Sequence, residues 1–192
     1  MRFILLVLIF SFPVAAVTQP DLQQELLAMT EADQAIRQQI TEAGWDNPPA
    51  ELMTQMAGID AQNTERLKQI IAQYSWVTPE LVGKKGVSSA FLIIQHSPDY
   101  AFQEAMLPIL KQAFLQGEGI DGQDFALLTD RVLVHRGEPQ IYGTQLNIID
   151  DALVFDPIKE PASVDARRAE VGLPPLEEYI RLLEDAYGLK VK

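Results

Sequence analysis

The stretch that decides the fold is VSSAFLIIQHSPDYAFQEAMLPILKQAFLQG, residues 87–117. Its opening, residues 87–95, is nearly all apolar and indicates a buried helix, although a short buried strand would show the same run. Ser97 is well placed as an N-cap with Pro98 at the first helical position, and the apolar residues that follow recur at helical spacing until Gly117. The stretch therefore predicts two consecutive helices that face a common core.

A leading helix is predicted over residues 20–43, where apolar residues recur at helical spacing and Gly44 can end the helix in a left-handed conformation. The other face is rich in Gln and Glu, and Asp33 interrupts the apolar seam. Such an amphipathic helix either covers its own domain or packs on a protein partner. We favour the first interpretation.

The connections around this framework are predicted from proline and glycine. Residues 47–49, Asn-Pro-Pro, form a turn that can start a short helix as far as Gly58, and Asp60 or Asn63 is expected to cap a second helix. Residues 83–86, Gly-Lys-Lys-Gly, are expected to form a flexible connector. The central stretch is therefore preceded by several separate helices.

The C-terminal part of the chain is predicted to hold helices and one hairpin. A helix is favoured over a strand for residues 121–136, because Asp121 can cap it and Gly137 can end it. The fold class is therefore mainly α, an orthogonal helical array with one small β-hairpin. The remaining elements are two short β-prone runs at 140–148 and 152–155 and two helices at 163–171 and 175–187.

The N-terminus has the order of a signal peptide. Arg2 gives a positive start, residues 3–12 are almost unbroken apolar sequence, and Val14-Ala15-Ala16 offers small residues for cleavage after Ala16. The apolar run is shorter than the roughly 20 residues of a membrane-spanning helix, and an uncleaved anchor is the alternative. We expect a periplasmic or secreted protein that is free of the membrane after cleavage. The expected segments are a signal peptide (1–16), a leading helix with its connector (17–58) and a helical domain (59–190).

The composition excludes several classes of function. The chain has no Cys, so disulfides and thiolate metal sites are excluded. A formal net charge of −12 argues against nucleic acid and anionic membranes as partners, because both require clustered positive charge. Only two His are present, without the spacing of a metal site, so neither a metal nor a cofactor is expected.

Several unusual polar strings recur through the second half of the chain, between about Trp76 and Tyr179. In this order and spacing they resemble an uncharacterised bacterial family, domain of unknown function 6624. The resemblance implies membership and supplies no mechanism, so the chemistry is argued from the residues. The strings are QHS (95–97), FQ (102–103), LLTDRV (127–132), QIYGTQ (140–145), DPI (156–158) and RRAEVGLPPL (167–176).

His96 is the main candidate for acid/base chemistry, because a histidine with its ordinary pKa of about 6.5 gives and takes protons near neutrality. Asp130 or Tyr142 could support it, which makes these three the candidate catalytic residues. An equally weighted alternative is a histidine that only caps the C-terminus of its helix. Ser97 is not favoured as a nucleophile, since capping already explains it.

Arg131 could grip a carboxylate or phosphate through two hydrogen bonds, and a structural ion pair with Asp130 is the alternative. His135 shares the apolar face of its predicted helix and is expected to be a core histidine with satisfied hydrogen bonds rather than a ligand.

The string at 140–145 combines a phenol, a hydroxyl and amides, which suits a neutral polar ligand. If it is a strand, Gln140, Tyr142 and Thr144 share one face; a hairpin knitted to the helices by hydrogen bonds is the alternative. Arg167 could form an anion clamp with Arg131. The candidate ligand-binding residues are Gln95, Arg131, Gln140, Thr144, Gln145 and Arg167.

Three functions remain open on these grounds. The first is an exported domain that binds a small polar or anionic ligand in a central pocket. The second is a metal-independent hydrolase or transferase with His96 as general base. The third is a scaffold whose polar strings are internal and whose leading helix binds another protein.

Overall fold

The computed structural model describes residues 17–44 and 48–192, and the predicted signal peptide lies outside the described residues. The described part is mainly helical with a small sheet, as the sequence predicts. None of its helices is both long and apolar enough to span a bilayer. The elements are α1 (Pro20–Ala43), α2 (Ala50–Tyr74), α3 (Pro79–His96), α4 (Tyr100–Gln116), α5 (Gly122–His135), β1 (Leu146–Ile149), β2 (Ala152–Phe155), a 3₁₀ turn (Pro161–Ser163), α6 (Val164–Glu170), α7 (Leu176–Tyr187) and β3 (Lys190–Val191).

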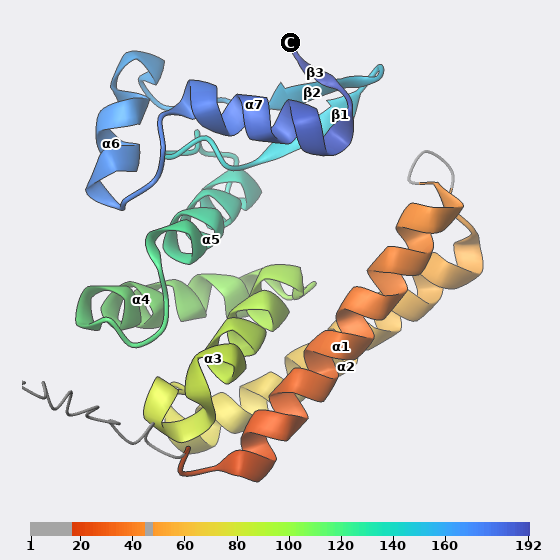
Figure 1. The fold of residues 1–192 in the computed structure, drawn as a ribbon, viewed down its shortest axis with the longest axis vertical. Helices are drawn as coiled ribbons and strands as arrows, with labels where there is room; N and C mark the ends of the chain where they lie inside the picture. Colours follow the sequence, from red (N-terminus) through yellow and green to blue (C-terminus); the bar gives the residue numbers. More distant parts are fainter. Residues whose placement is uncertain (1–16, 45–47) are drawn as a thin grey trace, which may run out of the picture.

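The helices form three successive groups (Figure 1). Helices α1 and α2 lie side by side as a long antiparallel hairpin, and α3 packs on both of them. Helices α4 and α5 continue from α3, and the end of the molecule opposite to the α1–α2 hairpin is formed by α6, α7 and the sheet.

Helix α1 covers the core with its apolar face. Leu22, Leu26, Ile36 and Ile40 are all buried, and the helix packs mainly on α3. This is the covering arrangement that the amphipathic pattern favours. Asp33 is buried with them, although it interrupts the apolar seam.

Helix α2 corrects the prediction of two separate helices, because it runs unbroken through Gly58. An interior glycine costs only about 1 kcal/mol relative to alanine, and packing along α1 offsets that cost. The predicted caps are therefore interior residues with tertiary partners. The side-chain amide of Asn63 donates to the carbonyl of Met29, and the carboxylate of Asp60 accepts from Arg37.

The predicted connector at 83–86 lies inside α3, where only Gly83 departs from helical geometry, with φ 69° and ψ 165°. A side chain there would be strained in the left-handed region, and its Cβ would lie 2.6 Å from the amide nitrogen of Gln23 on α1. The connector is thus a kink rather than a flexible loop. Beyond it, residues 87–95 form the predicted buried helix.

The junction between α3 and α4 corrects a second prediction. Asp99 is the N-cap of α4, and its carboxylate accepts from the backbone N–H of Phe102 at 3.0 Å. Ser97 instead ends α3, and its buried hydroxyl accepts from that of Thr64 at 3.0 Å. The amide of Gln103 donates to the last carbonyls of α3, so α4 holds the end of α3 in place.

Helix α5 is capped by Asp121, as predicted, and the structure shows that this cap is a capping box. The carboxylate of Asp121 accepts from the backbone N–H of Asp124 at 2.9 Å, and the side chain of Asp124 accepts from the backbone of Asp121. A Cβ at Gly122 would lie 1.6 Å from the carbonyl oxygen of Val171 at the end of α6. Glycine therefore permits α5 to dock closely against the C-terminal layer.

The predicted hairpin is present, but its first strand begins at Leu146 rather than at residue 140. Asp150 and Asp151 form its turn with φ of 49° and 55°, which is tolerated by aspartate. Residues 140–145 form no strand, so the predicted alternation of their side chains is wrong. The last strand, β3, adds to β2 in parallel and completes a three-stranded sheet.

Candidate functional site

A pocket of about 490 Å³ opens where α1, α3, α4 and α5 meet. Most of its polar lining is cationic or imidazole, in a chain whose net charge is −12. Three residues that the sequence predicted for a site, Gln95, His96 and Arg131, line this pocket. The lining residues are Arg37, Gln95, His96, Ser97, Pro98, Tyr100, Arg131 and His135.

Arg131 has no carboxylate partner within 4.0 Å among residues 17–44 and 48–192. With the amide of Gln95 turned so that its oxygen faces the guanidinium, that oxygen accepts from Nε at 2.8 Å and from Nη2 at 3.0 Å. Burial lowers the pKa of Arg131, the Tyr100 phenol acts in the opposite direction, and the charge of Arg37 adds a smaller lowering. The guanidinium is thus held by a neutral group and retains an uncompensated charge.

His96 contacts a buried carboxylate on α1. Its Nδ1 lies 2.8 Å from Oδ1 and 3.0 Å from Oδ2 of Asp33. Asp33 is only 1% exposed. Nδ1 also lies 3.0 Å from Nε of Arg37. Since Nδ1 cannot donate to a carboxylate and accept from a guanidinium at once, its proton has to be assigned from the charges.

The carboxylate decides this assignment. Burial raises the pKa of Asp33, but the hydrogen bond from His96, the charge of His96 when it is protonated and the charge of Arg37 outweigh it and hold that pKa below its ordinary range. Asp33 is therefore ionised and accepts the proton of Nδ1. The guanidinium of Arg37 is attracted to the same carboxylate, with Nη2 3.2 Å from Oδ1. In a neutral His96 the unprotonated nitrogen is then Nε2, for which no hydrogen bond is found among the described residues.

Arg37 is tied down by a second carboxylate, on α2. Its Nη2 donates to both oxygens of Asp60, at 2.8 and 2.9 Å. Burial raises the pKa of Asp60 even though the charge of Arg37 acts against it. Arg37 therefore contacts two carboxylates, Asp33 and Asp60, whereas Arg131 contacts none in the described part of the chain.

His135 corrects the prediction of a core histidine. It is exposed at the last turn of α5, where its ring lies 3.7 Å from that of Tyr100, centroid to centroid. Burial of the ring and the charge of Arg131 lower the pKa of His135. Position along the helix placed it near the apolar face, but the pocket opens on that side. The two rings form an aromatic wall of the pocket.

Asp130 lies outside this pocket, sealed inside the next layer. Its fully buried carboxylate accepts from the backbone N–H groups of Ile141, Tyr142 and Thr144 at 2.7 to 3.2 Å, and from the hydroxyl of Thr144 at 3.0 Å. Burial raises its pKa, and the four donors act in the opposite direction. The carboxylate organises the 140–145 loop and has no direct contact with His96.

The remaining predicted residues also knit this loop together. The amide of Gln140 donates to the carbonyls of Gln145 and Asp156, both at 2.8 Å, and accepts from the N–H of Gln145. Arg167 donates to the carbonyl of Ile141 at 2.8 Å. The structure thus brings Gln95, His96 and Arg131 together and places Asp130, Gln140, Tyr142, Thr144, Gln145 and Arg167 outside the pocket lining.

Sequence reasoning missed four residues of the site: Asp33, Arg37, Asp60 and Tyr100. One signal was available for the first two. An acidic residue that interrupts an apolar seam, followed four positions later by Arg, marks a charged pair on the buried side of a helix. Nothing in the local sequence links Asp60 to α1, because that contact spans two helices.

No cluster of three or more His, Cys, Asp or Glu side chains that could hold a metal ion occurs in the part of the chain that the structure describes.

Comparison with known proteins gives one match. The model of a family of unknown function, DUF6624, matches residues 20–192. This span includes α1 and α2 and so extends further toward the N-terminus than the motif resemblance. Neither the curated proteins nor the solved structures contain a match. Because the match covers nearly the whole chain, the protein belongs to the DUF6624 family.

Proposed function

We propose that this domain binds a small anionic ligand in the pocket between α1, α3 and α5. The observation that carries the proposal is the unmatched charge of Arg131. The guanidinium of Arg131 is partly buried and, within the described residues, has no carboxylate contact, so an anion from solution would stabilise it.

The surroundings of Arg131 support a specific ligand over loose ion pairing. Gln95 is 6% exposed and holds Nε and Nη2, so the guanidinium is oriented before a ligand arrives. Nη1 has no hydrogen-bond partner among residues 17–44 and 48–192 and is available to the ligand. The Tyr100–His135 wall offers a flat surface to the rest of a small organic anion.

Thermal unfolding in the presence of small anions tests this function. Diethyl phosphate, acetate and citrate are compared with triethyl phosphate and acetamide, which are neutral. A ligand that binds only the folded state raises the melting temperature, so the anions are expected to raise it and the neutral compounds are not. Calorimetry then gives the dissociation constant of the best anion.

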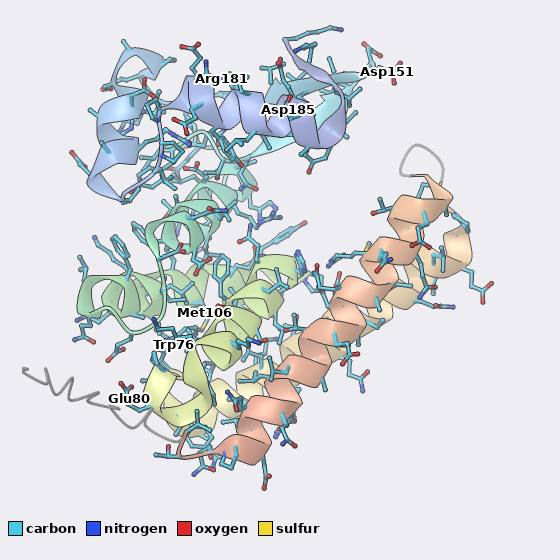
Figure 2. All side chains as sticks on the ribbon, in the orientation of Figure 1. Trp76, Glu80, Met106, Asp151, Arg181 and Asp185 are labelled. Atoms are coloured by element: carbon cyan, nitrogen blue, oxygen red, sulfur yellow. The ribbon has the colours of Figure 1, made fainter. Side chains whose placement is uncertain are left out.

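The variant Arg131→Gln is expected to abolish binding, and Arg181→Gln is its matched control. Arg181 lies on α7, in the layer formed with α6 and the sheet (Figure 2). It is exposed and pairs with Glu177, one turn away. Equal anion binding by Arg131→Gln and the unchanged protein would contradict the proposed function.

We also propose that the domain acts after export, as the N-terminal sequence predicts. Expression of the full chain in a bacterial host, followed by fractionation and mass spectrometry, is expected to give a mature N-terminus after Ala16 outside the cytoplasm. A full-length cytoplasmic product would contradict export. Binding of a protein partner through the leading helix stays a prediction, and the burial of its apolar face on α3 gives it no added support.

A further inference from the structure

We propose that the pocket hydrolyses phosphodiesters, with His96 as general base and Asp33 as the residue that positions it. This inference rests on the proposed anion site at Arg131 and adds a reaction to it. The juxtaposition that carries it is a carboxylate–imidazole pair whose histidine lines the same pocket as Arg131, a guanidinium without a carboxylate contact among the described residues.

The Asp33–His96 pair has the geometry of a base held by an orienting group. The carboxylate is buried on α1 and contacts Nδ1, while the His96 side chain is 23% exposed and lines the pocket. Such an arrangement fixes the tautomer, directs Nε2 outward and stabilises the imidazolium when it forms. A histidine that merely caps its helix has no need of a buried carboxylate from another helix.

Base and cation are held next to each other by the chain itself. Gln95 precedes His96 in the sequence, and its amide oxygen accepts two hydrogen bonds from Arg131. The end of α3 that carries both residues is fixed by the Gln103 amide. An anion bound by Arg131 therefore lies in the pocket that His96 also lines.

The charges select the class of substrate. Asp33 and Asp60 carry two negative charges against the one positive charge of Arg37, so this cluster has an excess of one negative charge beside the pocket and disfavours a ligand with two negative charges. A phosphodiester carries one negative charge, whereas a phosphomonoester carries nearly two at neutral pH and would meet the two carboxylates. In a phosphodiester the phosphate that Arg131 would bind is also the group that reacts. Arg131 can therefore stabilise the negative charge that develops on the phosphate oxygens in the transition state.

The reaction is hydrolysis by one water molecule. Nε2 of His96 takes a proton from water as the water oxygen forms a bond to phosphorus. The bond from phosphorus to one ester oxygen breaks, and its electron pair stays on that oxygen, which takes a proton from solvent at the pocket mouth. The phosphomonoester product leaves, and His96 returns its proton to solvent. No oxidant, reductant or second substrate is needed.

The test uses the purified protein with bis(p-nitrophenyl) phosphate as substrate and diethyl phosphate as an unreactive binding probe. The unchanged protein is expected to release p-nitrophenolate, and both His96→Gln and Asp33→Asn are expected to lower kcat by about 10²- to 10⁴-fold. The dissociation constant of diethyl phosphate is expected to stay within about threefold in Asp33→Asn. Added imidazole is expected to restore part of the activity of His96→Gly, which a purely structural role would not allow.

The control variant for Asp33→Asn is Asp151→Asn. Asp151 lies exposed at the turn of the hairpin (Figure 2), and asparagine tolerates its left-handed conformation. The kcat of Asp151→Asn is expected to equal that of the unchanged protein. Circular dichroism and thermal unfolding verify that each variant is folded before kinetics are compared.

The outcomes separate the two proposals. Binding of diethyl phosphate that depends on Arg131, without turnover above the buffer rate, overturns the hydrolase and leaves the anion site. Failure of Arg131→Gln to change binding overturns the anion site itself. Turnover that survives in His96→Gln overturns the role of His96, and faster turnover of p-nitrophenyl phosphate than of the diester overturns the choice of substrate class.

Discussion

Asp130 and Arg131 are neighbours in the sequence, yet they belong to opposite kinds of environment. Asp130 is sealed and uses its carboxylate to hold three backbone N–H groups and a hydroxyl of the 140–145 loop. Arg131 faces the pocket, with one side-chain amide as its partner and its charge unmatched. One of the two holds the fold together, and the other lines the pocket for which we propose an anionic ligand.

The reason is helix geometry. Consecutive residues of an α-helix point about 100° apart, so two adjacent polar residues on α5 serve different layers. A charged side chain with all its hydrogen bonds made inside the protein contributes to stability, and one with an unmatched charge is a candidate for binding. The predictions below test this difference, beginning with the sealed side.

Asp130→Ala is expected to have the largest effect on stability. It leaves the N–H groups that converge on the carboxylate without an acceptor in the interior, which we expect to lower the free energy of unfolding by more than about 3 kcal/mol. Urea unfolding measures the change, with Asp151→Ala at the exposed hairpin turn as the control. A loss below about 1 kcal/mol would contradict the structural role of Asp130.

Arg168→Met should have the next largest effect, because Arg168 serves the same loop. The residue is 1% exposed, donates to the carbonyls of Tyr142 at 2.7 Å and Pro174 at 2.6 Å, and lies over the ring of Tyr179. Methionine keeps much of the volume but none of the donors, so we expect a loss of about 2 to 3 kcal/mol in the same urea experiment. An unchanged unfolding midpoint would show that the carbonyls need no buried donor.

Arg131→Gln should hardly change stability, in contrast to its neighbour. No ion pair is lost among the described residues, and burial of the charge already lowers the pKa of Arg131. We expect a change of less than about 1 kcal/mol in the free energy of unfolding, together with loss of anion binding. A large destabilisation with binding retained would reverse the contrast between the two residues.

The smallest predicted effect concerns pH and the other buried carboxylate, Asp33. Its pKa is held below the ordinary value of 3.8 in the folded protein, so the carboxylate stabilises the fold above that pH. This contribution is lost as the pH falls through the lower, folded pKa. We therefore expect the stability difference between the unchanged protein and Asp33→Asn to shrink between pH 5 and pH 2, as measured by urea unfolding at each pH. A difference that stays constant over this range would contradict the lowered pKa.

Most helices could be predicted from the sequence because their signals are local. Apolar spacing and a terminal glycine define α1, and the capping residue Asp121 marks the start of α5. The errors arose where tertiary packing overrides a local signal. Gly58 does not interrupt α2, since packing on α1 offsets its low helix propensity. Residues 140–145 have strand-like composition, but three of their backbone N–H groups donate to the carboxylate of Asp130 instead of to a neighbouring strand.

The candidate site was only partly predictable. His96, Gln95 and Arg131 stand out as polar residues beside apolar runs, and the structure places all three at one pocket. Asp33, Arg37 and Asp60 complete the site from helices more than thirty residues away in sequence from His96. Their contribution depends on how α1 and α2 pack against α3, which no local pattern specifies.

By itself, the sequence determined the mainly helical fold class, the family and the residue types available for chemistry, because these follow from periodicity, composition and recognisable strings. Only the tertiary structure decided which polar residues hold the fold together and which line the pocket. That choice depends on the direction of each side chain and on the partner it meets across helices, and both are set by packing over long sequence separations.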